Sequence, residues 1–344
     1  MDDAICLKEA RVPWAAALPD SGVTEPLGED EAYRARLQIS DYYPPAVQPS
    51  TELIRHATVA DLPHVAEIWY EAAVGDDANP PALPGIPSLY QHELATQELF
   101  VLERDGCVVA FAAVINRGAI AFVADLFVSA AHRSAGLGQC LLGRVIPSDG
   151  RVCCTVSSRD PRALPLYIRF GLRPWWPHAQ LRAELAALSV LPPTDIEVIE
   201  AHADDPDWVR WDAEIGGRAR PEDYAYWMHR RDGVPLWFAR RGRIVGYGMA
   251  QTRSDDLLRY PHAVTLGPIG TRERKDAVVC VLAAVRWARE RAAMARISLT
   301  GPHPAAAPLL AAGFRIVEVE TFCLTADKPF FDVQRYISSG GDLF

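Results

Sequence analysis

The sequence predicts an α/β (α+β) protein made of two successive units that share one order of elements. In the first half a hairpin with its turn at Asp105-Gly106 is followed by a strand, a helix, a strand and a helix. The second half repeats this order after a hairpin that turns at Gly242. The final helices stop at Gly171-Leu172 and at Gly313-Phe314, about 140 residues apart, which is close to one domain length.

The elements follow from periodicity and from turn residues. Thr58 and Asp61 form a predicted capping box, and the apolar series that follows it predicts a helix over 62–72. The remaining predicted elements of the first half are strands at 52–56, 99–103, 108–115, 119–128 and 152–156, and helices at 89–97, 140–145 and 161–170. Those of the second half are strands at 236–239, 244–251, 263–269 and 297–300, and helices at 276–293 and 304–312.

Length and composition limit the class of protein. With 344 residues, 49% of them apolar and 23% charged, the chain is long enough for two cores. A formal charge of −9 argues against a nucleic-acid surface, and no apolar stretch is long enough for a membrane helix. Seven scattered cysteines and the absence of a signal peptide predict a reduced, cytoplasmic protein with no metal.

We expect four regions along the chain. An irregular N-terminal arm at 1–50 precedes a first domain at 51–185, and a linker near 189–195 leads to a second domain at 195–330. Residues 331–344 are expected to form a C-terminal tail.

One loop in the first unit indicates chemistry. Arg133-x-x-Gly136-x-Gly138 lies between a predicted strand and a predicted helix, where glycines let a ligand approach the backbone and free N–H groups favour an anion such as a pyrophosphate. The sequence has neither GxxxxGK[ST] nor a GxGxxG that opens a βαβ unit. The motif alone is weak, and glycines needed for tight packing at a helix start are the alternative.

With this loop and its neighbours, the sequence resembles the GNAT acyltransferase superfamily. Three blocks carry the resemblance: Leu126-Phe127-Val128, Arg133-x-x-Gly136-x-Gly138, and Leu166-Tyr167-Ile168-Arg169-Phe170-Gly171-Leu172. The likeness covers about 52–176, with 195–325 as a degenerate second copy. It implies two tandem domains, each a mixed, mostly antiparallel, twisted sheet flanked by helices.

The resemblance also implies acetyl-CoA as co-substrate. The pantetheine arm would lie on the backbone of Leu126, Phe127 and Val128. The diphosphate would lie on the loop formed by Arg133, Ser134, Ala135, Gly136, Leu137, Gly138 and Gln139.

Two residues are candidates for proton transfer. Tyr167 occupies the position at which the family often places the general acid for the departing thiolate, and a core tyrosine on an amphipathic helix is the alternative. Asp125 is an acid in an otherwise apolar strand; it would accept the amine proton, or it is a structural carboxylate satisfied by backbone N–H groups. Thr155 and Asp160 stand where relatives often have Glu and Asn, so the proton would otherwise leave through water.

The second copy has lost these features. Its loop is Arg274-x-x-Ala277-x-Val279, Pro268 removes a backbone N–H from the preceding strand, and Leu309 replaces the tyrosine. We therefore expect one acetyl-CoA site in the chain.

The resulting expectation is an acyl-CoA-dependent N-acyltransferase, most simply an N-acetyltransferase, in which a small-molecule or peptide amine attacks the thioester directly. The alternatives are a non-catalytic acyl-CoA-binding or sensing protein and an acyl-CoA enzyme with a non-amine acceptor. We expect no nucleic-acid or membrane partner, and a monomer or a homodimer. No motif identifies the acceptor.

Overall fold

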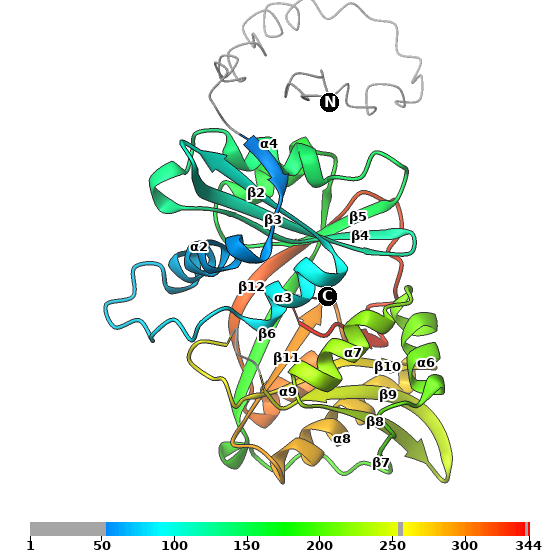
Figure 1. Cartoon of the computed structure of the whole chain (residues 1–344). Helices are drawn as coiled ribbons and strands as arrows, with labels where there is room; N and C mark the ends of the chain where they lie inside the picture. Colours follow the sequence, from blue (N-terminus) through cyan, green and yellow to red (C-terminus); the bar gives the residue numbers. More distant parts are fainter. Residues whose placement is uncertain (1–52, 254–256, 341–342) are drawn as a thin grey trace, which may run out of the picture.

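The computed structural model describes residues 53–253, 257–340 and 343–344, and the arm expected at 1–50 lies outside them. Figure 1 shows two α/β halves joined by a continuous sheet. The order of its strands is β1-β2-β3-β4-β5-β12-β6-β11-β10-β9-β8-β7, and β13 pairs with β10 beside this path. Most neighbouring strands are antiparallel, so the predicted fold class, two tandem units with mixed and mostly antiparallel strands flanked by helices, is confirmed.

The first unit follows the predicted order closely. Thr58 and Asp61 form the expected capping box, because the backbone N and Oγ1 of Thr58 both donate to Oδ2 of Asp61, at 2.7 and 2.8 Å. The elements are β1 (Leu53–His56), α2 (Leu62–Val74), α3 (Ser88–Thr96), β2 (Glu98–Arg104), β3 (Cys107–Arg117), β4 (Ile120–Val128), α4 (Leu137–Val145), β5 (Val152–Ser157), α5 (Ala163–Arg169) and β6 (Arg173–Glu184). Helices α2 and α3 pack on one face of this sheet, and α4 and α5 on the other.

The second unit adds two helices that periodicity did not predict. Helix α6 starts at an aspartate cap, where Asp205 accepts a hydrogen bond of 2.9 Å from the backbone N of Asp207. The elements are β7 (Glu197–Glu200), α6 (Pro206–Gly216), α7 (Pro221–Arg230), β8 (Gly233–Arg240), β9 (Arg243–Gln251), β10 (Val264–Thr271), α8 (Ala277–Arg289), β11 (Met294–Thr300), α9 (Ala306–Ala312), β12 (Arg315–Leu324) and β13 (Tyr336–Ile337).

The two units exchange their last long strands. β12, the last long strand of the second unit, pairs with β5 of the first, with Thr321 opposite Ser157. β6, the last strand of the first unit, pairs with β11 of the second, with Gln180 opposite Ser298. The two exchanged strands also pair with each other, and in Figure 1 they run between the halves. Each unit thus completes its sheet with a strand from the other.

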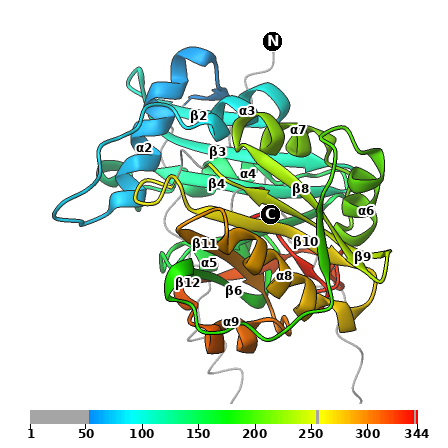
Figure 2. The ribbon, with the colours of Figure 1, turned by 90° about the horizontal axis from the view of Figure 1, so that it is seen from below.

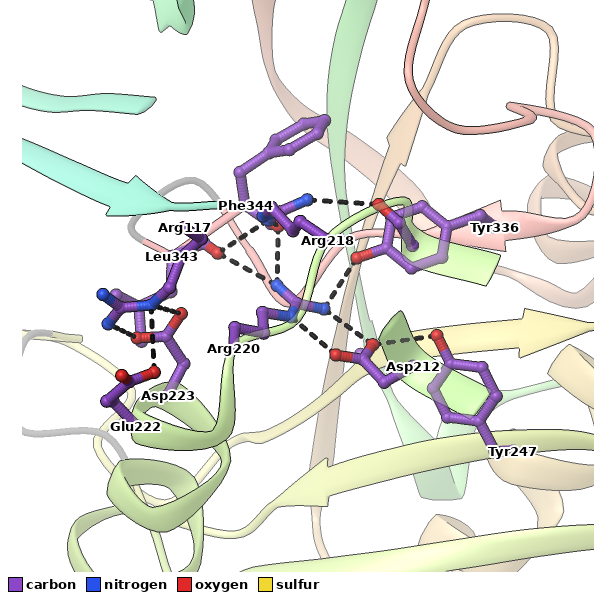
Figure 3. Close-up of polar contacts among 12 residues, drawn as sticks. Arg117, Asp212, Arg218, Arg220, Glu222, Asp223, Tyr247, Tyr336, Leu343 and Phe344 are labelled. Atoms are coloured by element: carbon purple, nitrogen blue, oxygen red, sulfur yellow. Dashed lines mark hydrogen bonds and ion pairs between the residues drawn. The ribbon is translucent and has the colours of Figure 1, made fainter. Parts of the chain in front are cut away.

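Helices of both units meet across the face that carries α3 and α7, as Figure 2 shows from below. Arg117 at the end of β3 donates to Asp223 of α7 at 2.6 and 3.1 Å (Figure 3). His92 of α3 lies 3.1 Å from the same carboxylate. Burial alone would raise the pKa of Asp223, but the bonds from His92 and Arg117 hold it below its usual range. The charged aspartate therefore ties the two units together.

The end of the described chain lies in the core between the units. The ring of Phe344 is fully buried and stacks on Phe322 of β12 at 4.8 Å. Arg220 donates to the backbone oxygen of Phe344 at 2.8 Å and to the hydroxyl of Tyr336 at 2.7 Å, while Asp212 neutralises the same guanidinium (Figure 3). Residues 331–340 therefore pack into the molecule together with Leu343 and Phe344.

Candidate active site

A bulge in β4 opens the sheet of the first unit. Asp125 lies opposite Ala113 and Val123 opposite Val114, so Ala124 is an extra residue without a partner position on β3. The parallel pairing between β4 and β5 ends at Val123 and Thr155. Beyond the bulge, no strand among the described residues pairs with the β5 side of β4. We call this opening between β4 and β5 the first gap.

The predicted pantetheine-binding residues form the β4 edge of the first gap. The side chains of Leu126 and Val128 pack with the core under α4 and α5, whereas Phe127 points to the α2 side and stacks on Phe111 at 5.3 Å. Because their side chains are engaged on the two faces, these residues offer the gap their backbone.

The predicted diphosphate loop lies at the end of this edge. Ser134 and Gly136 both have left-handed backbone angles, with φ of 63° and 85°, and Gly136 is the residue before the first turn of α4. Among the described residues, the N–H groups of residues 134–138 donate to no backbone carbonyl. Alternating backbone angles followed by a helix start make a concave set of donors that suits an anion.

The other loop residues have defined places. The Nε of Arg133 donates to the carbonyl of Val128 at 3.1 Å, which ties the loop to the end of β4. Ala135 and Gln139 are exposed, and Leu137 is buried beneath the helix. The N–H of Gln139 bonds to the carbonyl of Gly136 at 3.0 Å, so this residue does not share the free donors of its neighbours.

Gly138 has room that the protein itself does not fill. A Cβ placed on it would meet Leu166 at 3.6 Å and Val128 at 3.8 Å, which is ordinary contact. Packing therefore does not require a glycine here. The alternative explanation, that this glycine allows tight packing at the helix start, loses its support. A ligand lying close to the backbone would require one.

Tyr167 and Asp125 approach the first gap from opposite faces of the sheet. Tyr167 on α5 is buried near Thr155, whose Oγ1 donates to the carbonyl of Val123 at 2.8 Å. Burial raises the pKa of Tyr167, the Thr155 hydroxyl opposes this rise, and the charge of Asp125 adds to it. Tyr167 is therefore protonated throughout the neutral pH range, and the negative charge of Asp125 is close enough to raise its pKa.

A cavity of about 260 Å³ borders Asp125 on the α2 side. Its first-unit wall includes Trp69, Leu89, Tyr90 and the exchanged strand β6, and its second-unit wall comes from β9, β10, β11 and β12. Asp125 is thus a wall residue of this cavity and also a neighbour of the first gap.

Sequence reasoning missed Glu320 on β12. Burial raises the pKa of Glu320 to about 7, although Gln180 donates to its Oε2 at 2.8 Å and opposes the rise. Glu320 lies opposite His178 of β6, one residue before the part of β12 that pairs with β5. β5 is the strand on which Thr155 stands in place of the acid common in relatives. No local pattern in the sequence indicates that β12 lies next to β5, so no signal could have identified this residue.

In the second unit the equivalent gap is filled by the chain itself. The pairing of β10 with β11 is limited to Val264 and Thr265, and the register with β9 shifts between Leu266 and Ile269. β13 then pairs with β10, and the N–H of Thr271 bonds to the carbonyl of Arg335 at 3.0 Å. We call this opening, between β10 and β11, the second gap.

The second loop is closed as well. Asp276, directly before α8, is buried and ion-paired with Arg240, and Arg274 bonds to Asp332 at 2.7 Å. A Cβ on Gly267 would lie 2.2 Å from the carbonyl of Ser338, so that glycine serves contact with the C-terminal segment. The degenerate loop predicted for the second copy is thus covered by residues 332–338.

The residues of the first gap fit acetyl-CoA. Pantetheine amides and a pyrophosphate need backbone hydrogen-bonding groups, and the β4 edge and the loop at 134–138 supply them side by side. Among the described residues, no group of three or more His, Cys, Asp or Glu side chains is arranged to hold a metal ion. No helix in the described part of the chain has the length and apolar character needed to cross a membrane.

Comparisons with known proteins agree with this geometry. Residues 95–173 match the family model for the acetyltransferase (GNAT) domain. No curated protein matches the chain by sequence.

Solved structures show the same fold at low identity. A putative acetyltransferase from Pyrococcus horikoshii has 15% identity and a TM-score of 0.68 over 88% of this chain and 99% of its own. A GCN5-related N-acetyltransferase from Sphaerobacter thermophilus has 17% identity and a TM-score of 0.55 over 83% and 99%. A tandem GNAT protein from the clavulanic acid biosynthesis pathway has 16% identity and a TM-score of 0.53 over 81% and 98%. Residues 95–173 therefore match the GNAT acetyltransferase domain, and the described part of the chain has the tandem-GNAT fold.

Proposed function

We propose that this protein is an acyl-CoA-dependent N-acyltransferase that transfers an acetyl group from acetyl-CoA to an amine. The observation that carries the proposal is the first gap, which combines the open β4 edge, free N–H groups at 134–138 and the hydroxyl of Tyr167. The match of residues 95–173 to the GNAT acetyltransferase domain supports the same conclusion.

In this proposal the two ends of acetyl-CoA are held by backbone groups. The β4 edge at Leu126–Val128 orients the pantetheine arm, and the loop from Arg133 to Gln139 binds the diphosphate. Acetyl-CoA supplies an acetyl thioester, which an amine can attack directly. Backbone N–H groups beyond the bulge polarise the thioester carbonyl.

Tyr167 and Asp125 divide the proton transfers. The buried Tyr167 keeps its proton at neutral pH and can give it to the departing sulfur as the general acid. Asp125 borders the cavity from which an amine would approach, and it receives the proton that the amine loses. The two groups lie on opposite faces of the sheet, so the proton taken from the acceptor amine and the proton given to the leaving sulfur move on different sides.

The test combines calorimetric titration of acetyl-CoA with the variant Gly138→Ala. Because the added Cβ meets only ordinary contacts, the variant should fold with an equal or higher melting temperature. It should nevertheless bind acetyl-CoA at least about tenfold more weakly, a loss of roughly 1.4 kcal/mol. Gly143→Ala is the matched control on the same helix, where a Cβ would meet Phe170 at 3.6 Å, and it should bind normally.

Equal affinity in wild type and Gly138→Ala would mean that the loop holds no diphosphate. If acetyl-CoA binds but a broad amine screen releases no free CoA, the protein is an acyl-CoA-binding or sensing protein. Release of CoA with hydroxyl or thiol acceptors alone would point to a non-amine acceptor.

A further inference from the structure

The floor of the cavity is a polar band that crosses the sheet. Ser298, Gln180 and Glu318 are direct cross-strand neighbours on β11, β6 and β12. Gln251 and Thr265 pair in the same way on β9 and β10, and Thr265 pairs with Arg296. All six line the cavity. A sheet face covered by helices normally carries apolar side chains, so a continuous polar band under α2 and α3 calls for a polar occupant.

Charge is separated along this band. The carboxylates Asp125 and Glu318 stand on β4 and β12, at the first-unit end. The guanidinium of Arg296 stands on β11, and that of Arg231, which follows α7, is also on the wall. Glu318 and Arg296 stand on strands two spacings apart, about 10 Å, and Asp125 on β4 lies two further spacings beyond Glu318. The wall therefore carries carboxylates beside the first gap, of which Glu318 also pairs with the exposed Arg159 at 3.3 Å, and guanidinium groups farther along the sheet.

Two buried hydroxyls at the basic end have no hydrogen-bond partner among the described residues. Thr265 is 7% exposed and Ser339 is 6% exposed, and both line the cavity. Within the part of the chain that the structure describes, neither Oγ atom has a hydrogen-bond partner. Buried hydroxyls are normally satisfied, and these two face the cavity, where a ligand can complete their hydrogen bonds.

We propose that this cavity is the acceptor site and that the acceptor is a small amine that carries a carboxylate several bonds away. Its amino group lies by Asp125 and Glu318, next to the first gap, and its carboxylate lies by Arg296, Arg231 and the hydroxyls of Thr265 and Ser339. This inference rests on the proposed function and adds the chemical class of the acceptor. The cavity volume, about 260 Å³, suits such a molecule and not a long peptide.

The chemistry balances without a further reactant. The amine nitrogen forms a bond to the acetyl carbonyl carbon, and the carbon–sulfur bond of the thioester breaks. The sulfur leaves with the electron pair and takes a proton from Tyr167, while the nitrogen loses a proton to Asp125. Solvent returns both residues to their starting states.

The experiment measures CoA release with two matched series of acceptors. One series is the ω-amino acids from glycine to 6-aminohexanoate, and the other is the alkylamines of the same lengths without a carboxylate. The expected result is a kcat/KM at least about tenfold higher for the ω-amino acids. Because the charged walls are separated, the preference should be greatest for chains of about three to five methylenes and weak for glycine.

The variant for this test is the double substitution Thr265→Val with Ser339→Ala. Removing buried hydroxyls that have no partner among the described residues should leave the melting temperature equal or higher. The variant should raise KM for ω-amino acids about tenfold or more and leave KM for alkylamines unchanged. Ser338→Ala is the matched control, since this neighbouring hydroxyl is also buried and has no partner among the described residues, but does not line the cavity.

The outcomes separate this inference from the proposed function. Acetylation of both series at equal rates, or a double variant that behaves like Ser338→Ala, would overturn the carboxylate-bearing acceptor and leave the acetyltransferase intact. If no amine releases CoA, the proposed function fails, and calorimetric titration of 5-aminopentanoate decides the site. Binding that the double variant loses would uphold the site, and no binding to wild type would overturn it.

Discussion

The first and second gaps arise in the same way but end differently. In both units a bulge separates two parallel strands, after Val123 in β4 and after Leu266 in β10. Beyond the bulge the first gap has no strand partner among the described residues, whereas the second is occupied by β13. The chain's own backbone takes the place in the second unit that we assign to pantetheine in the first.

This difference shows why the motif residues differ between the copies. A loop that binds a diphosphate needs glycines and free N–H groups, and the first copy keeps Gly136 and Gly138. A gap closed by β13 needs neither, and its loop carries Ala277 and the ion-paired Asp276. In the second unit an internal contact stands where we propose a ligand site in the first.

The largest effect is expected from truncating the buried tyrosine of β13. Tyr336→Ala removes a side chain that is 1% exposed and leaves Arg220 without its bond to the hydroxyl. The free energy of unfolding should therefore fall by about 3–5 kcal/mol. Tyr336→Phe keeps the ring and should cost about 1–2 kcal/mol. Urea unfolding of both variants measures this. A loss below about 1 kcal/mol for Tyr336→Ala would show that β13 is dispensable.

The next effect concerns the first gap. Tyr167→Phe keeps the buried ring and removes the proposed acid, so kcat should fall about 100-fold while acetyl-CoA affinity stays within about twofold. Steady-state kinetics and calorimetry of the same protein samples test this. Full turnover in the variant would return Tyr167 to the role of a core residue.

A smaller effect concerns Glu320, the carboxylate that strand exchange adds to the first unit. Its pKa in the folded protein, about 7, lies above the usual 4.5, so folding favours its protonated form. This stabilisation is complete below pH 4.5 and is lost as pH rises through 7. Wild type should therefore lose about 1–2 kcal/mol more stability than Glu320→Gln between pH 5 and pH 8. Parallel pH dependence of the two proteins in urea unfolding would contradict it.

The smallest effect is an expected absence of change. Restoring glycines to the second loop with Ala277→Gly and Val279→Gly should not create a second acetyl-CoA site, because β13 still fills the second gap. Calorimetric stoichiometry should remain one per chain. Two sites per chain would mean that loop sequence alone, and not occupation of the gap, separates the two units.

Local features of the fold were predictable because they depend on neighbouring residues. The capping box at Thr58 and Asp61, the hairpin turns and the helix stops at Gly171 and Gly313 all follow from short-range rules. The loop from Arg133 to Gly138 was found in the same way, since its glycines are adjacent in sequence.

Long-range pairing was not predictable. Residues 173–184 include Pro174 and Pro177, which indicated a stop, yet they form β6, and nothing in the sequence indicates that β11 is its partner. The filled second gap depends on pairing between β10 and β13, two segments far apart in sequence. The cavity is assembled from both units, so its lining could not be read from either half.

The exchange of β6 and β12 also sets an order of events during synthesis. When the ribosome has made the first unit, the open edge of β5 has no partner, because residues 315–324 have not yet emerged. At that stage β6 also lacks its partner β11, which is translated more than a hundred residues later. Neither half can complete its sheet before most of the chain is available, so we expect maturation to be late and cooperative rather than unit by unit.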